Sequence, residues 1–324
     1  MTQSAGGSPD TSIVIVTYNS GVEIAECLEA AILTGAEIVV IDNASRDNTA
    51  EVVGSYPVRL IENRENRGFA GAVNQGTRET SASYVLLLNP DAVLLNGIEP
   101  LLAQIVRPGV GAVAGMLTGA TGQPQAGFTV RRLPSALTLS FEVLGLNRIF
   151  PRNPLNWRFR CFGLNLSGSV PIRVEQPAGA FFMFRRECWV ALGGFDEQFH
   201  PLWFEDVDFC ARLKLLGKEI LLVPTAVAKH TGAHSILNMT LEIRQLYWYG
   251  NLLRYAAKHF SPSGRKLVSL SVLFGVILRS IGQIGRGGAV RKQVVRLAMR
   301  CFGGRPGWDE KRDAKRHGGA PAIR

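Results

Sequence analysis

Short apolar runs alternate with amphipathic stretches along the first third of the chain. The runs have no polar alternation, which is typical of strands buried on both faces of a parallel sheet. The predicted strands are 12–16, 37–41, 58–61, 85–88 and 110–117, and the helices between them are 22–33, one after Ser45, 69–80 and 97–106. This alternation predicts right-handed crossovers and an α/β fold with a mostly parallel central sheet flanked by helices.

The pattern is less regular in the second half of the chain. A turn-rich segment at 118–124 favours a hairpin, and 176–184 is an apolar strand that begins with small residues. Residues 205–216 have the spacing of a helix. The strand 219–223 is expected to lead into a loop that contains His230.

Amphipathic helices dominate the pattern beyond residue 240. Residues 241–259 predict one such helix, followed by a Ser-Pro-Ser-Gly breaker at 261–264. The apolar stretch 267–278 is shorter than the roughly 20 residues of a spanning helix. We therefore expect it to lie in a membrane interface or to pack on the body of the protein, and the sequence leaves both open. Basic residues recur at helical spacing within 286–300.

The net charge of +10 is unevenly distributed over the 324 residues. Residues 240–324 contain 17 Lys and Arg against 4 Asp and Glu, which is +13, and residues 1–239 contain the other 19 and 22, which is −3. This asymmetry favours an anionic partner for the tail, either a membrane surface or nucleic acid. The tail lacks the aromatic platforms of single-strand binders, so we expect no nucleic acid.

Composition excludes several other classes. With 46% hydrophobic residues the chain can bury a large core. Its first ten residues resemble no signal peptide, so we expect it at the cytoplasmic side. The cysteines number five and form no CxxC pair, which argues against both a disulfide framework and a zinc site.

Polar side chains follow three of the predicted strands where those strands end. Pro90 stops the strand before it, so Asn89 and Asp91 project from its carboxyl end, where open α/β sheets bind ligands. Their oxygens suit a hard cation that also binds substrate phosphates. The alternative is a turn that closes a strand, which is about as common for these residues.

The other two strand ends carry Thr17 to Asn19 and Asp42 with Asn43. A carboxylate such as that of Asp42 can accept the imide N–H of uracil or thymine, although a capping or turn role is the commoner case for an isolated Asp. Between the strands, Arg67 and Gly68 open a predicted helix and offer a guanidinium and a close backbone approach to phosphate.

Acidic residues cluster at the start of the helix predicted at 205–216. Asp208 and Arg212 are four residues apart and are expected to form an ion pair. Asp206 points to another side of the helix, where the helix dipole should keep it ionised and fit it as a general base. The alternative is that Glu205 and Asp206 are ordinary first-turn acids. Later, His230 and His234 follow a strand four residues apart; a histidine in a loop is more often structural, but one of these, with His230 favoured, could complete a metal site begun by Asp91.

An arginine-rich region separates the two halves. Between residues 131 and 160, arginines are interleaved with apolar and aromatic residues. We expect a mobile segment suited to the headgroup of a diphosphate-linked lipid, or else a solvated insertion.

Together these motifs resemble those of the inverting family 2 glycosyltransferases of GT-A fold, most of all bacterial rhamnosyltransferases that act on lipid-linked glycans. The resemblance covers about residues 11–235. The matching segments are Val16-Thr-Tyr-Asn19, Val40-Ile-Asp-Asn-Ala-Ser45, Asn66-Arg-Gly-Phe-Ala70 with Asn74, Leu88-Asn-Pro-Asp91, Gly179-Ala-Phe-Phe182, Gly194-Phe-Asp196, Phe204-Glu-Asp-Val-Asp208 and His230.

The resemblance implies roles for individual residues. Asp206 would be the catalytic base, and Asp91 with His230 would hold a divalent metal, Mg²⁺ or Mn²⁺. Asn89 departs from the family pattern, which often has Asp there. The donor would contact Thr17, Tyr18, Asn19, Asp42, Asn43, Asn66, Arg67, Gly68 and Asn89, and the acceptor would contact Gly179, Ala180, Trp203 and Glu205.

The sequence thus predicts a metal-dependent transferase that moves a sugar, L-rhamnose from dTDP-L-rhamnose, to a lipid-linked or other cell-envelope glycan from the cytoplasmic membrane face. A UDP-sugar transferase and a nucleotide-sugar-binding protein without activity remain alternatives. The oligomeric state is left open, with a dimer as one option. The predicted domains are a catalytic domain at 11–238, divided into nucleotide-binding (11–117) and acceptor (118–238) halves, a membrane-associating helical extension at 239–302 and a disordered tail at 303–324.

Overall fold

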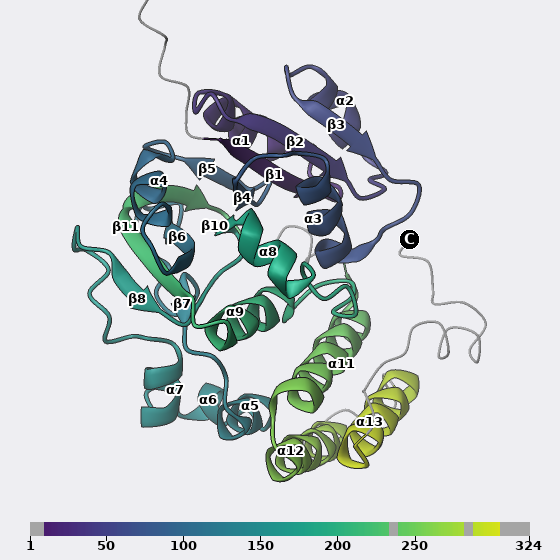
Figure 1. Ribbon diagram of the computed structural model, residues 1–324. Helices are drawn as coiled ribbons and strands as arrows, with labels where there is room; N and C mark the ends of the chain where they lie inside the picture. Colours follow the sequence, from purple (N-terminus) through teal and green to yellow (C-terminus); the bar gives the residue numbers. More distant parts are fainter. Residues whose placement is uncertain (1–9, 233–238, 282–287, 305–324) are drawn as a thin grey trace, which may run out of the picture. The chain divides into compact units, whose positions relative to one another are not determined.

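The computed structural model describes residues 10–232, 239–281 and 288–304 (Figure 1). These residues form two compact units. The first unit contains the chain up to residue 133 together with 160–201 and 205–232. The second contains 134–159, 202–204 and the described residues from 239 onward.

A nine-stranded sheet is the centre of the first unit, with the order β3-β2-β1-β4-β10-β6-β11-β5 and with β8 paired to β11. A separate two-stranded sheet joins β7 and β9. The strands are β1 (Thr11–Thr17), β2 (Glu37–Asp42), β3 (Arg59–Glu62), β4 (Tyr84–Leu88), β5 (Ala92–Leu94), β6 (Val110–Thr118), β7 (Val130–Arg131), β8 (Ile172–Val174), β9 (Gln176–Pro177), β10 (Phe181–Arg185) and β11 (Glu219–His230).

Strand direction brings several chain segments to one edge of this sheet. β1 runs parallel to both β2 and β4, so residues that follow these strands emerge on the same side. β10 is antiparallel to β4, and its first residue, Phe181, pairs with Leu88 at the end of β4. The start of β10 therefore lies at the edge where β1, β2 and β4 end.

Helices cover both faces of the sheet because its strands are apolar on both faces. Ile13 and Ile15 point toward α1 (Ile24–Ile32), α2 (Thr49–Gly54) and α4 (Glu99–Ile105). Val14 and Val16 point toward α3 (Gly68–Arg78), α8 (Arg186–Leu192) and α9 (Glu205–Leu215). The fold is therefore mixed α/β with a mostly parallel central sheet flanked by helices, as the alternating pattern predicts.

Helices make up the regular structure of the second unit within its described residues. They are α5 (Ala136–Val143), α6 (Leu146–Ile149), α7 (Pro154–Phe159), α11 (Leu241–His259), α12 (Pro262–Ile281) and α13 (Gly288–Phe302). α12 packs against α5, α11 and α13. Within the described chain, no helix combines the length and the apolar character needed to cross a bilayer.

Two local predictions are wrong. Ser45 does not cap a helix: α2 begins later, at Thr49, and the Ser45 hydroxyl bonds Asp42 instead. The segment after Val223 is not a loop, because β11 continues to His230 through a register shift between Val223 and Val227 that accommodates Pro224, which has no N–H to donate. The breaker predicted at 261–264 does end the first tail helix: α11 stops at His259, and α12 begins at Pro262, where its missing N–H costs nothing.

Residues 131–160 also differ from the expected mobile segment. Most of this region folds as α5, α6 and α7, and α5 packs against α12 of the tail. The domain boundaries at 238 and 302 remain predictions, and residues 305–324 of the predicted tail lie outside the described chain. What the structure adds is that 134–159 belongs to the same compact unit as the C-terminal helices.

Candidate active site

The ends of β1 and β2 are joined by hydrogen bonds around one buried carboxylate. Asp42 accepts from the Thr17 hydroxyl at 2.9 Å, from the backbone N–H of Ser45 at 3.0 Å and from the Ser45 hydroxyl. Asn19 takes a positive φ of 53° and accepts from the backbone N–H of Arg46 at 2.7 Å. Asp42 therefore holds the two loops together. It has this structural role whether or not its carboxylate also contacts a nucleotide base.

Asn43 connects the end of β2 to the start of α3. Its amide donates to the side chain of Asn66 at 2.9 Å, and its side-chain oxygen accepts from the backbone N–H of Arg67 at 2.9 Å. Gly68 follows with a φ of +73°, and a Cβ there would lie 2.5 Å from the His200 ring. Only glycine allows this close approach at the first residue of α3.

Asp91 and His230 meet at the same edge. The last residue of β11, His230, pairs with Ala92 of β5, directly after Asp91. Its Nε2 lies 3.4 Å from Oδ1 of Asp91, and the other carboxylate oxygen accepts from the backbone N–H of Gly232 at 2.9 Å. Both side chains are largely buried, with 4% and 10% of their surface exposed.

A glutamine sets the orientation of the His230 ring. The amide nitrogen of Gln125 donates to the backbone oxygen of His230 at 2.7 Å, which turns its Oε1 toward Nδ1 of the ring at 3.2 Å. Because Oε1 can only accept, Nδ1 carries the proton and Nε2 keeps a lone pair facing Asp91. Phe128 stacks on the other side, with ring centroids 5.3 Å apart. Burial lowers the pKa of His230 although the charge of Asp91 acts to raise it, which favours the neutral ring.

This pair fits a divalent cation. Two ligand atoms that each lie about 2.1 Å from one cation, side by side in its coordination shell, are about 3 Å apart, close to the 3.4 Å seen between Asp91 and His230. A carboxylate oxygen and a neutral imidazole nitrogen are donors that Mn²⁺ accepts. Among the described residues, no group of three or more His, Cys, Asp and Glu side chains is arranged to hold a metal.

Asp206 lies in the first turn of α9 and is held by backbone N–H groups. Its Oδ2 accepts from the N–H of Gly179 at 3.2 Å and lies 3.4 Å from the amide nitrogen of Gln176, and its Oδ1 accepts from the N–H of Val207 at 2.7 Å. Burial raises the pKa of Asp206, although these N–H groups and the charge of Arg131 act to lower it. Desolvation therefore outweighs the groups that lower this pKa.

Glu205 precedes this acid and is buried. Burial, followed by the negative charge of Asp206, raises the pKa of Glu205 well above its ordinary value. Its Oε2 has no hydrogen-bond partner among the described residues. The side chain is therefore favoured in its neutral form. The expected pair of Asp208 and Arg212 forms at 2.7 Å, which leaves Asp206 as the distinct acid of this helix.

A short chain of contacts links Asp91 to Asp206. The backbone N–H of Asn89, two residues before Asp91, donates to the oxygen of Ala180 at 3.0 Å. Ala180 follows Gly179, whose N–H holds Asp206. The structure therefore brings both acids, 115 positions apart, to the carboxyl edge of β4 and the start of β10.

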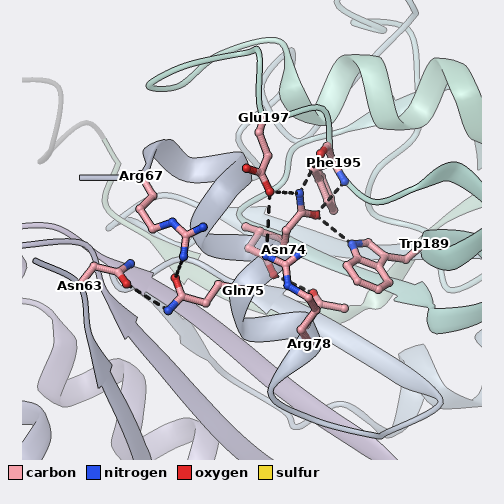
Figure 2. Close-up of polar contacts among 10 residues, drawn as sticks. Asn63, Arg67, Asn74, Gln75, Arg78, Trp189, Phe195 and Glu197 are labelled. Atoms are coloured by element: carbon pink, nitrogen blue, oxygen red, sulfur yellow. Dashed lines mark hydrogen bonds and ion pairs between the residues drawn. The ribbon is translucent and has the colours of Figure 1, made fainter. Parts of the chain in front are cut away.

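A buried asparagine fastens the loop before α9 to α3. Asn74 donates to the backbone oxygen of Phe195 and to the carboxylate of Glu197, and accepts from the backbone N–H of Phe195 and the indole of Trp189, at 2.8–3.0 Å (Figure 2). In the same view Arg67 donates to Gln75, and Gln75 donates to Asn63, on the side of α3 away from Trp189.

The structure also shows where two other predicted site residues lie and which contacts the sequence did not predict. Tyr18 is half-buried between Thr17 and Asn19, at the end of β1. Trp203 belongs to the second unit and so is not among the residues gathered here. Sequence reasoning missed Gln125 as a partner of His230, and Gln176 and Arg131 as partners of Asp206. Gln125 directly follows the predicted hairpin turn, but only the pairing of β11 with β5 shows that this turn reaches His230.

Comparison with characterised proteins points in one direction. The chain is 29% identical over 245 residues to the N-acetylglucosaminyl-diphospho-decaprenol L-rhamnosyltransferase of Mycobacterium tuberculosis, covering 69% of this chain and 76% of the relative. It is 27% identical over 201 residues to the poly-beta-1,6-N-acetyl-D-glucosamine synthase of Staphylococcus aureus, covering 59% of this chain and 42% of that protein.

Solved structures show the same fold. The mannosyltransferase PcManGT from Pyrobaculum calidifontis, in complex with GDP-Man and Mn²⁺, superposes with a TM-score of 0.51 at 18% identity, over 90% of this chain and 81% of that one. GalNAc-T7 with UDP, GalNAc and Mn²⁺ gives a TM-score of 0.52 at 17% identity, over 76% and 50%. These neighbours are glycosyltransferases of GT-A fold.

The sequence profile described as "Glycosyl transferase family 2" matches residues 12–189, more than half of the chain. The matched range contains the strand ends that carry Asp42, Asn89 and Asp91, and it reaches the start of β10 beside Asp206. With its fold and its sequence in agreement, this chain is a member of glycosyl transferase family 2.

Proposed function

We propose that this glycosyltransferase inverts the anomeric centre of its donor sugar and depends on a divalent metal. The observation that carries the proposal is the single sheet edge at which Asp91 with His230 and Asp206 with Gly179 come together through Asn89 and Ala180. A site of this kind has a cation-binding pair for a diphosphate and a separate carboxylate for a hydroxyl.

Asp206 is the base in this reaction. Its raised pKa makes the carboxylate a better proton acceptor once it is ionised. It removes the proton of the acceptor hydroxyl as that oxygen forms a bond to the anomeric carbon. The bond from that carbon to the diphosphate oxygen breaks and its electron pair leaves with the nucleoside diphosphate. A single displacement inverts the centre, so no carboxylate nucleophile is required.

Asp91 and His230 would hold the metal. When bound there, a divalent cation neutralises the charge that develops on the leaving diphosphate. Gln125 keeps Nε2 of His230 unprotonated and directed toward Asp91. The N–H of Gly232 fixes the other oxygen of Asp91, so the free oxygen faces the ring. These contacts orient both ligands before any cation arrives.

The donor proposed is dTDP-L-rhamnose and the acceptor a polyprenyl-diphosphate-linked glycan. Similarity to a decaprenol-linked rhamnosyltransferase supports both. A UDP-sugar donor for polysaccharide synthesis is the second candidate, supported by the similarity to poly-beta-1,6-N-acetyl-D-glucosamine synthase. Asp42 would accept the imide N–H, which uracil and thymine share, so the base contact does not separate these donors.

Replacing Asp206 tests the proposal. Purified protein would be supplied with Mn²⁺, a panel of dTDP- and UDP-sugars, and a short-chain prenyl-diphosphate-linked N-acetylglucosamine. We expect one donor to be turned over, and Asp206→Asn to lower kcat by at least about 10²-fold, with donor binding retained, because the amide cannot accept the proton. The matched control is Asp208→Asn, which lies on the same helix but serves an ion pair.

Two outcomes would contradict the proposal. Unchanged kcat for Asp206→Asn would remove it as the base. Binding of nucleotide sugars without turnover of any donor by the wild type would support a binding protein without transferase activity.

A further inference from the structure

One face of α12 is apolar and uncovered within its own unit. Val268, Val272 and Val276 are buried, and they face the neighbouring helices α5, α11 and α13. On the other side, apolar side chains are between 42% and 55% exposed, and these residues are Leu267, Leu270, Phe274, Ile277 and Leu278. We call this set the α12 face.

The spacing of these residues places them on one stripe. At 100° per residue, all five fall within an arc of about 100° around the helix axis. The buried valines occupy the opposite arc. A stripe of this kind along several turns of a helix is an apolar patch, whereas singly scattered apolar residues would need no explanation.

The segment that carries the α12 face is strongly basic in sequence. Residues 262–302, which span α12 and α13, contain eight Lys and Arg and no Asp or Glu. Lys266 borders the stripe and is exposed, and Lys292 of α13 is exposed as well.

We propose that the α12 face docks on an anionic lipid bilayer, with its apolar side chains in the acyl boundary and its lysines at the headgroups. An apolar stripe bordered by basic residues is the pattern of helices that lie in a membrane interface. A second copy of the chain is a poorer occupant, because pairing this face with itself would bring two clusters of like charge together. The inference rests on the proposed function only in that a lipid-linked acceptor would be met at such a surface.

The α12 face, and not α11, is the surface assigned to the bilayer. The sequence predicts a membrane-associating extension over 239–302 as a whole, which includes α11. In the structure its second half, from Tyr249 to Ala256, is buried. Its Asn251 donates to the backbone oxygen of Leu202 at 2.8 Å, so this helix packs within the second unit.

Vesicle co-sedimentation of the full chain tests the proposal without donor or acceptor. The probes are vesicles of phosphatidylcholine alone and of phosphatidylcholine mixed with phosphatidylglycerol. We expect the wild type to prefer the mixed vesicles and to dissociate as salt is raised. The double variant Leu270→Ser with Phe274→Ser should bind them at least about tenfold more weakly.

Matched controls separate this effect from misfolding. Leu33→Ser removes an apolar side chain that is 88% exposed in the first unit, and it should bind vesicles like the wild type. Lys266→Glu with Lys292→Glu should lose the preference for mixed vesicles but keep weak binding to neutral ones. Thermal unfolding of each variant shows whether it folds. Because the wild-type side chains are exposed, we expect transitions close to that of the wild type.

Three results would overturn the inference. The double variant could bind as tightly as the wild type, or the wild type could bind neutral and anionic vesicles equally. Alternatively, ultracentrifugation could reveal a wild-type dimer that the double variant dissociates, which would make a second copy the occupant. Loss of vesicle binding with intact turnover of a soluble acceptor leaves the proposed transferase standing, and the converse leaves the membrane surface standing.

Discussion

At the scale of single residues, the geometry of the candidate site at the strand ends depends on side chains that orient other side chains. Asp91 and His230 are recognisable in the sequence by type and by place, but the residue that fixes the ring of His230 is not. Gln125 is one of many glutamines that could follow a turn. Its role exists only because its amide nitrogen bonds the backbone of His230 and so aims its oxygen at the ring.

The first prediction concerns Gln125. Gln125→Ala removes the acceptor that holds the proton on Nδ1, so the ring can rotate or place its proton on the nitrogen that faces Asp91. We expect Mn²⁺ to bind about 10- to 100-fold more weakly, as for other residues that orient metal ligands. Titration calorimetry with Mn²⁺ and the apo protein measures this without turnover.

Gln123→Ala is the matched control, since Gln123 lies two positions earlier and is exposed. It should leave the affinity unchanged. If His230→Ala weakens Mn²⁺ binding and Gln125→Ala does not, the positioning role is wrong. If neither does, the metal site itself is elsewhere.

At the scale of elements, the alternating pattern predicts most helices and strands because apolar runs bury on both faces of a parallel sheet. It could not predict that β10 enters antiparallel between β4 and β6, since strand direction in the second half depends on which distant strand is available. Yet this insertion is what brings Gly179 and Asp206 to the strand ends of the first half. The loop before α9 is held there by Asn74.

The second prediction therefore concerns Asn74. Its side chain is 3% exposed and makes four hydrogen bonds to Trp189, Phe195 and Glu197. Asn74→Ala leaves buried backbone and indole groups without partners, so we expect the free energy of unfolding to fall by about 2–4 kcal/mol. Urea denaturation measures this free energy.

Arg78→Ala is the control. It breaks an exposed 4.0 Å contact to Glu197 and should lower the free energy of unfolding by less than about 0.5 kcal/mol. Equal effects would show that Asn74 is not the fastening residue.

At the scale of the whole molecule, buried acids make folding depend on pH. The pKa of Glu205 is raised in the folded state, chiefly by burial and then by the charge of Asp206. Below its ordinary pKa, both states carry the proton. Above it, the unfolded chain releases the proton while the folded chain retains it, so stability falls as pH rises toward the folded pKa.

Glu205→Gln tests this third prediction because the amide does not titrate. We expect the urea midpoint of the wild type to fall from pH 5 to pH 8 more steeply than that of the variant. Glu51→Gln, at an exposed position of α2, should follow the wild type. Parallel curves for wild type and Glu205→Gln would mean that this carboxyl does not retain its proton in the fold.

The charge asymmetry indicates a distinct C-terminal tail from the sequence alone. No comparable pattern indicates the segment of the chain against which this tail packs. The arginine-rich insertion and the C-terminal helices are separated by more than eighty residues, and no local pattern links them. Their association depends on contact between α5 and α12, where Gly264 lets the helices meet: a Cβ there would lie 3.2 Å from that of Ala136.

That contact limits how the enzyme can be shortened or recombined. A truncation at residue 240 would remove α12, the helix against which α5 packs. The insertion would then be exposed within an otherwise intact catalytic fold. Grafting the C-terminal helices alone onto another transferase would leave them without their support. The two segments have to be moved or removed as a pair.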